Sequence, residues 1–361
     1  MTAWIPVVKP NIGPQETLAV NRVLESGMLA QGDEVSLFEN EFSKLVSKTF
    51  CVAVNSGTSA IHLSLLALGI GRGDEVIVPS FTFAATANAV ALTGATPIFM
   101  DIDPKTYNLD SSLIEAAITP RTKAILPVHL YGQPAPMREI LDIAKQHDLL
   151  VIEDACQAPL ASINGKPVGS FGSAGAFSFY PTKNMTSGEG GMVTTSSEDI
   201  ARKVQLLRNQ GMEEKYKNEI FGFNNRMTDI HASIGRVQLS KLRDWTEKRR
   251  SNASFFDQNL DGVTTPFVSP ESYHVYHQYT IRIVGHDRDV FAQQMASRGI
   301  GSGVYYPTPV HRLPSYQQTE ELPHTEQATR EVLSIPVYPS LEQWELEAIV
   351  SAVNSIAAAG S

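Results

Sequence analysis

The chain has 361 residues, of which 42% are hydrophobic and 19% charged, a composition typical of a folded globular protein with a large core. The net charge is −9 and no run of Lys and Arg forms a broad basic face, which argues against general nucleic-acid binding. The N-terminus lacks a basic segment followed by an apolar one, and no apolar run reaches the roughly 18 residues of a membrane span. We therefore expect a cytoplasmic protein without nucleic-acid or membrane partners. Cys51 and Cys156 lie in apolar segments, which favours buried reduced thiols over a metal site.

Short β-rich runs alternate with helical patterns from residue 50 to about 197. The expected strands are 51–54, 75–78, 96–100, 124–127, 149–153, 175–179 and 191–195. Between two of these strands, Met137, Ile140, Leu141 and Ala144 recur at the spacing of a crossover helix. This alternation predicts an α/β layer with a largely parallel sheet.

A long helical pattern covers residues 228–260, and we expect a domain boundary near Trp245. Beyond it, Tyr279, Ile281 and Ile283 alternate with Thr280 and Arg282, as in a half-exposed strand. A helical pattern follows at 290–295. The sequence thus predicts a large domain, 1–245, which includes the N-terminal segment, and a smaller C-terminal α+β domain, 246–361.

Lys183 closes the run 178–183 and lies 29 positions after Asp154, the acid that ends the apolar segment 149–154. A lysine amine can hold an aldehyde cofactor as a Schiff base, and a carboxylate can keep a pyridine nitrogen protonated. The two residues together suggest pyridoxal phosphate chemistry. Taken alone, Asp154 could equally cap the following loop.

The segment Asn55, Ser56, Gly57, Thr58, Ser59 turns from an expected strand into the apolar helix 60–68. Free N–H groups at such a helix start, with a glycine and hydroxyls, can cradle a phosphate. The segment alone favours the simpler interpretation, a plain helix cap.

Three further residues could approach a cofactor ring. Gln157 could reach the 3-oxygen of the ring or be an ordinary loop amide. Phe83 could stack on the ring, although a single aromatic residue after a strand is more often core, and Phe81 competes for either role. The glycines at 69–73 follow a helix and precede a strand, the reverse of the order that a dinucleotide-binding loop needs.

Together these segments resemble the DegT/DnrJ/EryC1/StrS sugar aminotransferases, pyridoxal-phosphate enzymes of fold type I that act on nucleotide-linked keto sugars. The resemblance covers nearly the whole chain, through motifs at 5–6, 31–32, 56–58, 73–79, 97–103, 153–157, 178–183, 222–227 and 306–311. It implies the α/β fold of pyridoxal-phosphate-dependent transferases of fold type I, with a large, mostly parallel sheet domain and a smaller C-terminal domain.

The resemblance also implies roles for individual residues. Lys183 would carry the cofactor and shuttle a proton, Asp154 would pair with the pyridinium, Gln157 would contact the ring oxygen, and Phe83 would stack on the ring. The phosphate would be held by Gly57, Thr58, Ser59 and Ser178, and by Asn224 of a neighbouring subunit. The last role implies a homodimer with shared active sites.

The implied reaction moves an amino group from L-glutamate to a keto sugar linked to a nucleotide diphosphate. The segment 188–191 resembles members that aminate C4, so we expect a 4-keto-6-deoxyhexose. A 3-keto sugar aminotransferase, a sugar dehydratase and a non-catalytic regulatory homologue are the alternatives, and Lys183 disfavours the dehydratase because those relatives carry histidine there.

Three residues are candidates for contact with the substrate. Tyr306 and His311 fall in a segment that resembles a substrate-side wall, but a core tyrosine and an exposed histidine are equally compatible with the sequence. Arg226 could bind the substrate or the neighbouring site, or only pair with a carboxylate such as Asp229.

Overall fold

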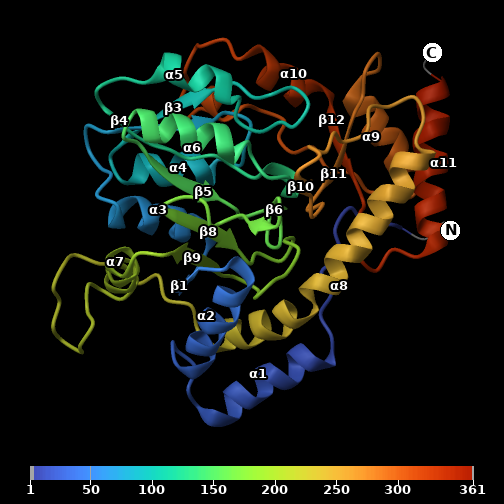
Figure 1. Cartoon of the computed structure of the whole chain (residues 1–361). Helices are drawn as coiled ribbons and strands as arrows, with labels where there is room; N and C mark the ends of the chain where they lie inside the picture. Colours follow the sequence, from blue (N-terminus) through green and yellow to red (C-terminus); the bar gives the residue numbers. More distant parts are fainter. Residues whose placement is uncertain (1–3, 49, 360–361) are drawn as a thin grey trace.

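Seven strands form the central sheet of the computed structural model, which describes residues 4–48 and 50–359 (Figure 1). They are β1 (Phe50–Val54), β2 (Glu75–Pro79), β3 (Thr96–Met100), β4 (Thr122–Ile125), β5 (Leu150–Asp154), β8 (Ala174–Ser178) and β9 (Gly191–Thr195). Their order is β1-β9-β8-β5-β4-β2-β3, and β9 alone runs antiparallel to its neighbours. The predicted, largely parallel sheet is confirmed, with each strand end within two residues of its expected position.

Successive residues of each strand point to opposite sides of the sheet, and the apolar residues on both sides are covered by helices. In β1, Val52 and Val54 pack towards α3 (Gly57–Ala67), α4 (Ala85–Leu92) and α7 (Glu198–Arg208). Cys51 and Ala53 pack on the opposite face against α2 (Asp33–Val46). The expected crossover helix is α6 (Met137–Gln146), which covers that second face near β4 and β5.

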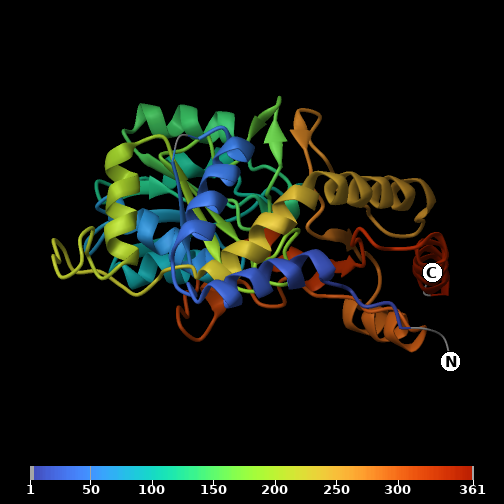
Figure 2. The same ribbon diagram turned by 90° about the horizontal axis from the view of Figure 1, so that it is seen from below.

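One long helix, α8 (Asp229–Asn259), links the sheet to the C-terminal part of the chain (Figure 2). Its Leu242 packs in the cluster under the sheet, whereas Ala253 and Phe256 pack in the C-terminal cluster. The expected boundary near Trp245 therefore falls inside a continuous helix, and the division into two domains stays a prediction.

The C-terminal part pairs β11 (Tyr279–Arg282) with β12 (Val332–Ile335) and flanks them with α9 (Arg288–Ser297) and α11 (Gln343–Ala359). The remaining elements are α1 (Pro14–Ser26), η1 (Ser111–Leu113), α5 (Ile114–Ala117), η2 (Leu130–Gly132), β6 (Ser162–Ile163), β7 (Lys166–Pro167), β10 (Ser272–Tyr273), η3 (Val310–Arg312) and α10 (Pro323–Glu331). Within the described residues, no helix is long and apolar enough to cross a membrane, and no cluster of side chains could hold a metal ion.

One local expectation differs from the structure. The strand pattern places Thr280 on an exposed face, but Thr280 is buried, and its hydroxyl lies 2.8 Å from that of Ser334 on the paired strand. This difference arises from long-range pairing, which local periodicity does not report. In the N-terminal segment, Ile5 forms a parallel bridge with Ile300 and packs in the C-terminal cluster.

Candidate active site

A cavity of about 690 Å³ opens at the carboxyl ends of β2, β5 and β8. These strands run in the same direction, so the segments that follow them converge on one edge of the sheet, the usual place for a ligand in such folds. Lys183, Asp154, Gln157, Phe83 and Ser178, all expected site residues, line it. The sequence therefore identified residues that the fold brings together from distant positions.

Lys183 lies in the segment that follows β8, where its backbone N–H donates to the carbonyl of Tyr180 at 2.9 Å. Burial lowers the pKa of its amine, although nearby Cys156 and Asp154 act in the opposite direction. A lowered pKa leaves more of the amine neutral near pH 7, and the neutral amine is the form that attacks a carbonyl.

Asp154 ends β5 and exposes only 5% of its surface. Its Oδ1 accepts a hydrogen bond from the N–H of Cys156 at 3.1 Å, and its Oδ2 accepts one from the hydroxyl of Thr86 at 2.8 Å. The carboxylate is thus held at both oxygens. The sequence analysis did not identify Thr86 as a site residue. It lies in the first turn of α4 and lines the cavity.

The start of α3 presents free backbone N–H groups to the same cavity. Ser56 is the N-cap, and its hydroxyl accepts the N–H of Ser59 at 3.1 Å. The N–H groups of Gly57 and Thr58 have no acceptor within residues 4–48 and 50–359. A Cβ at Gly57 would lie 2.7 Å from Cβ of Ser178, so glycine permits the close approach here. The segment is a helix cap, and its free N–H groups are compatible with the expected phosphate cradle.

Ser59, expected with this phosphate group, is placed differently. It is not among the residues that line the cavity, and its hydroxyl donates to Oδ1 of Asn55 at 2.7 Å. A hydroxyl already committed to a neighbouring side chain is less available to a ligand.

Aromatic and amide side chains form the walls. Phe83 is 57% exposed at the cavity, whereas Phe81 is buried in the core, so the structure separates the two competing aromatics. Gln157 accepts the N–H of Tyr131 at 2.8 Å and donates to the hydroxyl of Tyr306 at 3.0 Å. Tyr306 lines the cavity, and burial raises the pKa of its phenol, which therefore remains a hydrogen-bond donor at neutral pH.

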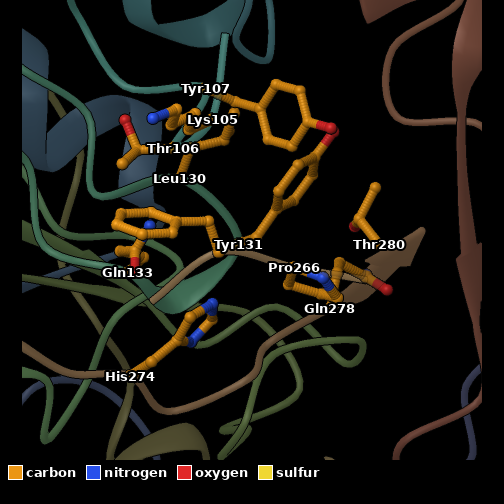
Figure 3. Close-up of a pocket in the computed structure, with 11 residues that line it drawn as sticks. Lys105, Thr106, Tyr107, Leu130, Tyr131, Gln133, Pro266, His274, Gln278 and Thr280 are labelled. Atoms are coloured by element: carbon orange, nitrogen blue, oxygen red, sulfur yellow. The ribbon is translucent and has the colours of Figure 1, made fainter. Parts of the chain in front are cut away.

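A second hollow, of about 10 Å³, shares Tyr131 and Gln278 with the cavity (Figure 3). The ring of Tyr107 lies beside that of Tyr131, with 6.0 Å between ring centroids. Such a space holds about one water molecule. This hollow adjoins Tyr131 and is too small for a substrate.

The C-terminal part also contributes residues that the sequence did not single out. His277, Gln278 and Tyr305 line the cavity with Tyr306. Nδ1 of His277 lies 3.3 Å from Oδ1 of Asn184, and burial together with the charge of Lys183 lowers the pKa of the imidazole well below its usual value. His277 is thus a neutral ring beside the lysine. Its only sequence signal is its place just before β11.

Two candidate substrate contacts lie outside the cavity lining. His311 is fully buried, with Nδ1 2.6 Å from the hydroxyl of Ser80 and Nε2 3.8 Å from Glu326, so it is neither a cavity residue nor an exposed one. Arg226 donates to Oδ1 of Asn209 at 2.8 Å.

The alternative ion pair between Arg226 and Asp229 is not formed within residues 4–48 and 50–359. Asp229 instead accepts the N–H groups of Gly32 and Val35, at 2.8 and 3.1 Å. Asn224 is exposed in the segment between α7 and α8 and is likewise outside the cavity lining.

The cavity fits pyridoxal 5'-phosphate. It offers an amine for the aldehyde, a buried carboxylate for the ring nitrogen and an unsatisfied helix start for the phosphate. An α/β sheet with this set of groups at its carboxyl edge defines a pyridoxal-phosphate-dependent transferase of fold type I.

Comparison with known proteins specifies the family. Residues 10–354 match the DegT/DnrJ/EryC1/StrS aminotransferase family. GDP-perosamine synthase of Caulobacter vibrioides is 40% identical over 364 residues, which cover 98% of each chain. The dTDP-3-amino-3,4,6-trideoxy-alpha-D-glucose transaminase of Streptomyces venezuelae is 40% identical over 344 residues, covering 93% of this chain and 90% of that protein.

The crystal structure of DesV from S. venezuelae superimposes with a TM-score of 0.95 at 38% identity and covers 99% of both chains. The chain therefore belongs to the DegT/DnrJ/EryC1/StrS aminotransferase family. It is a pyridoxal-phosphate-dependent sugar aminotransferase.

Proposed function

We propose that this enzyme transfers an amino group from L-glutamate to the ketone of a nucleotide-diphosphate-linked sugar, and that the sugar is a 4-keto-6-deoxyhexose. The observation that carries the proposal is the common cavity of Lys183 and Asp154, whose volume of about 690 Å³ leaves room for a sugar beside the cofactor. The names of the relatives, a GDP-sugar and a dTDP-sugar enzyme, support a nucleotide-linked acceptor.

The bound cofactor supplies an aldehyde that carries the amino group and a ring that accepts electrons. Asp154, held at both oxygens, would pair with the ring nitrogen. Lys183 would be the covalent attachment point and, once released, the base that moves a proton at the carbon bearing the amino group. Gln157 and Tyr306 would orient the ring edge, while Phe83 would cover its face.

We further propose that the functional unit is a homodimer in which Asn224 of one subunit reaches the phosphate held by the other. The exposed position of Asn224, next to exposed Phe221 and Phe223, supports this arrangement.

The C4 position rests on the segment 188–191, a tight connection before β9 in which Glu189 lines the cavity. Amination at C3 is the second candidate, since the S. venezuelae relative is named for a 3-amino sugar. Both proposals require an acceptor positioned by its nucleotide, whose remote contacts can fix the ketone against the reacting carbon.

The test is a panel of 3-keto and 4-keto sugars linked to different nucleotides, with L-glutamate as donor, and NMR of the product. We expect an amine at C4 and a far poorer reaction with the free keto sugar. An amine at C3 would contradict the proposed position but not the enzyme class. Equal rates with a free sugar would contradict the need for the nucleotide, and Lys183→Ala is the inactive control.

A further inference from the structure

Two buried hydroxyls lead to the carboxylate of Asp154. Thr86 Oγ1 lies 2.8 Å from Asp154 Oδ2, and Thr82 Oγ1 lies 3.0 Å from Thr86 Oγ1. Thr82 and Thr86 expose 2% and 1% of their surfaces, and both line the cavity. They come from the segment between β2 and the first turn of α4, whereas Asp154 comes from the end of β5.

The chemistry of the three groups fixes the direction of the hydrogen bonds. Thr86 donates its single hydroxyl proton to Oδ2 of Asp154. The oxygen of Thr86 is then the acceptor for the hydroxyl proton of Thr82. The order is Thr82 to Thr86 to Asp154, and each bond in such a chain polarises the next.

We propose that Thr86, supported by Thr82, is a positioning residue that holds Asp154 in the orientation needed to pair with the ring nitrogen of the cofactor. The inference rests on the proposed role of Asp154, and it assigns to Thr86 the control of cofactor affinity and ring electronics. The other oxygen of Asp154 is held by the backbone N–H of Cys156, which only a proline substitution would remove. The hydrogen bond from Thr86 is therefore the one that an ordinary side-chain substitution can remove.

The first experiment compares holoenzymes carrying Thr86→Val and Thr86→Ser. Valine keeps the shape of threonine but removes the donor, and serine restores the donor. A hydrogen bond to a charged group is strong enough that its loss should lower kcat, and raise the cofactor dissociation constant, by roughly 10- to 100-fold. KM for the amino donor should change much less. Thr86→Ser should return both quantities close to wild type.

Cofactor affinity is measured by equilibrium dialysis with absorbance of the retained cofactor, so it is independent of which sugar the enzyme uses. If Thr86→Val binds cofactor as tightly as wild type, or if Thr86→Ser is as defective as Thr86→Val, the positioning role is wrong. Failure to find a sugar acceptor would instead contradict the proposed function and leave this measurement unaffected.

Double variants separate action through Asp154 from direct contact with the cofactor. In an Asp154→Asn background, Thr86→Val should weaken cofactor binding little further. Likewise, Thr82→Val should have a smaller effect than Thr86→Val and almost none when added to it. Full additivity of Thr86→Val and Asp154→Asn would show that Thr86 acts on its own and would overturn the proposal.

Discussion

At the scale of single residues, the site places ionisable side chains in a cavity where burial makes their charged forms unfavourable. An amine, a carboxylate and a neutral imidazole share one partly closed cavity, where burial disfavours charge on Lys183 and on His277. Perturbed groups of this kind concentrate at functional sites. Burial thus increases the neutral, nucleophilic fraction of the lysine amine.

The lowered pKa of Lys183 predicts how the cofactor-free enzyme takes up pyridoxal phosphate. Because the neutral amine attacks the aldehyde, the attachment rate should rise with pH and reach half its maximum below 10.5, the ordinary pKa of lysine. Stopped-flow absorbance across a pH series measures this midpoint, with a lysine peptide in solution as the reference. A midpoint equal to that of the peptide would mean that burial does not control the amine.

At the scale of elements, the sequence predicted the helices, strands and caps that depend on local residue patterns. The strands, the long helix and the cap at Ser56 follow from periodicity and capping chemistry, and all are present. Lys183, Asp154 and Gly57 were identifiable because Asp154 ends a strand and the other two lie in the segments that follow strands. Thr86 and His277 were not, since their importance arises from contacts with residues far away in the chain.

The segment between α7 and α8 projects from the sheet and carries Asn224 (Figure 1). Within this segment Phe221 is fully exposed and Tyr216 is largely exposed, which is costly for an isolated monomer in water. In the proposed homodimer, the second copy of the chain covers these rings, and the same contact brings Asn224 to the neighbouring cavity.

This arrangement predicts that two inactive variants complement each other. If Lys183→Ala and Asn224→Ala each inactivate the dimer, mixing them should produce heterodimers with one intact site, formed by the wild-type lysine and asparagine of different chains. Regained activity is measured after subunit exchange has been verified with differently tagged chains. Exchange without any recovery would contradict the shared site, and mixing Lys183→Ala with itself is the control.

At the scale of the whole molecule, the cavity lies where the sheet and the C-terminal part meet. Lys183 and Asp154 come from the first, and His277 and Tyr306 from the second. The long helix α8 joins both parts, since Leu242, near its middle, packs under the sheet and Phe256, near its C-terminus, packs in the C-terminal cluster. The C-terminal core should therefore influence the site from a distance.

We predict that Phe256→Ala weakens cofactor retention although Phe256 is not a cavity residue. Removing this fully buried ring should destabilise the C-terminal core by about 3–5 kcal/mol, and so loosen the wall that carries His277 and Tyr306. Thermal unfolding and cofactor loss on dialysis are measured together, with Lys248→Ala, an exposed site on the same helix, as the matched control. A lower unfolding temperature with unchanged cofactor retention would show that the two parts are not coupled through α8.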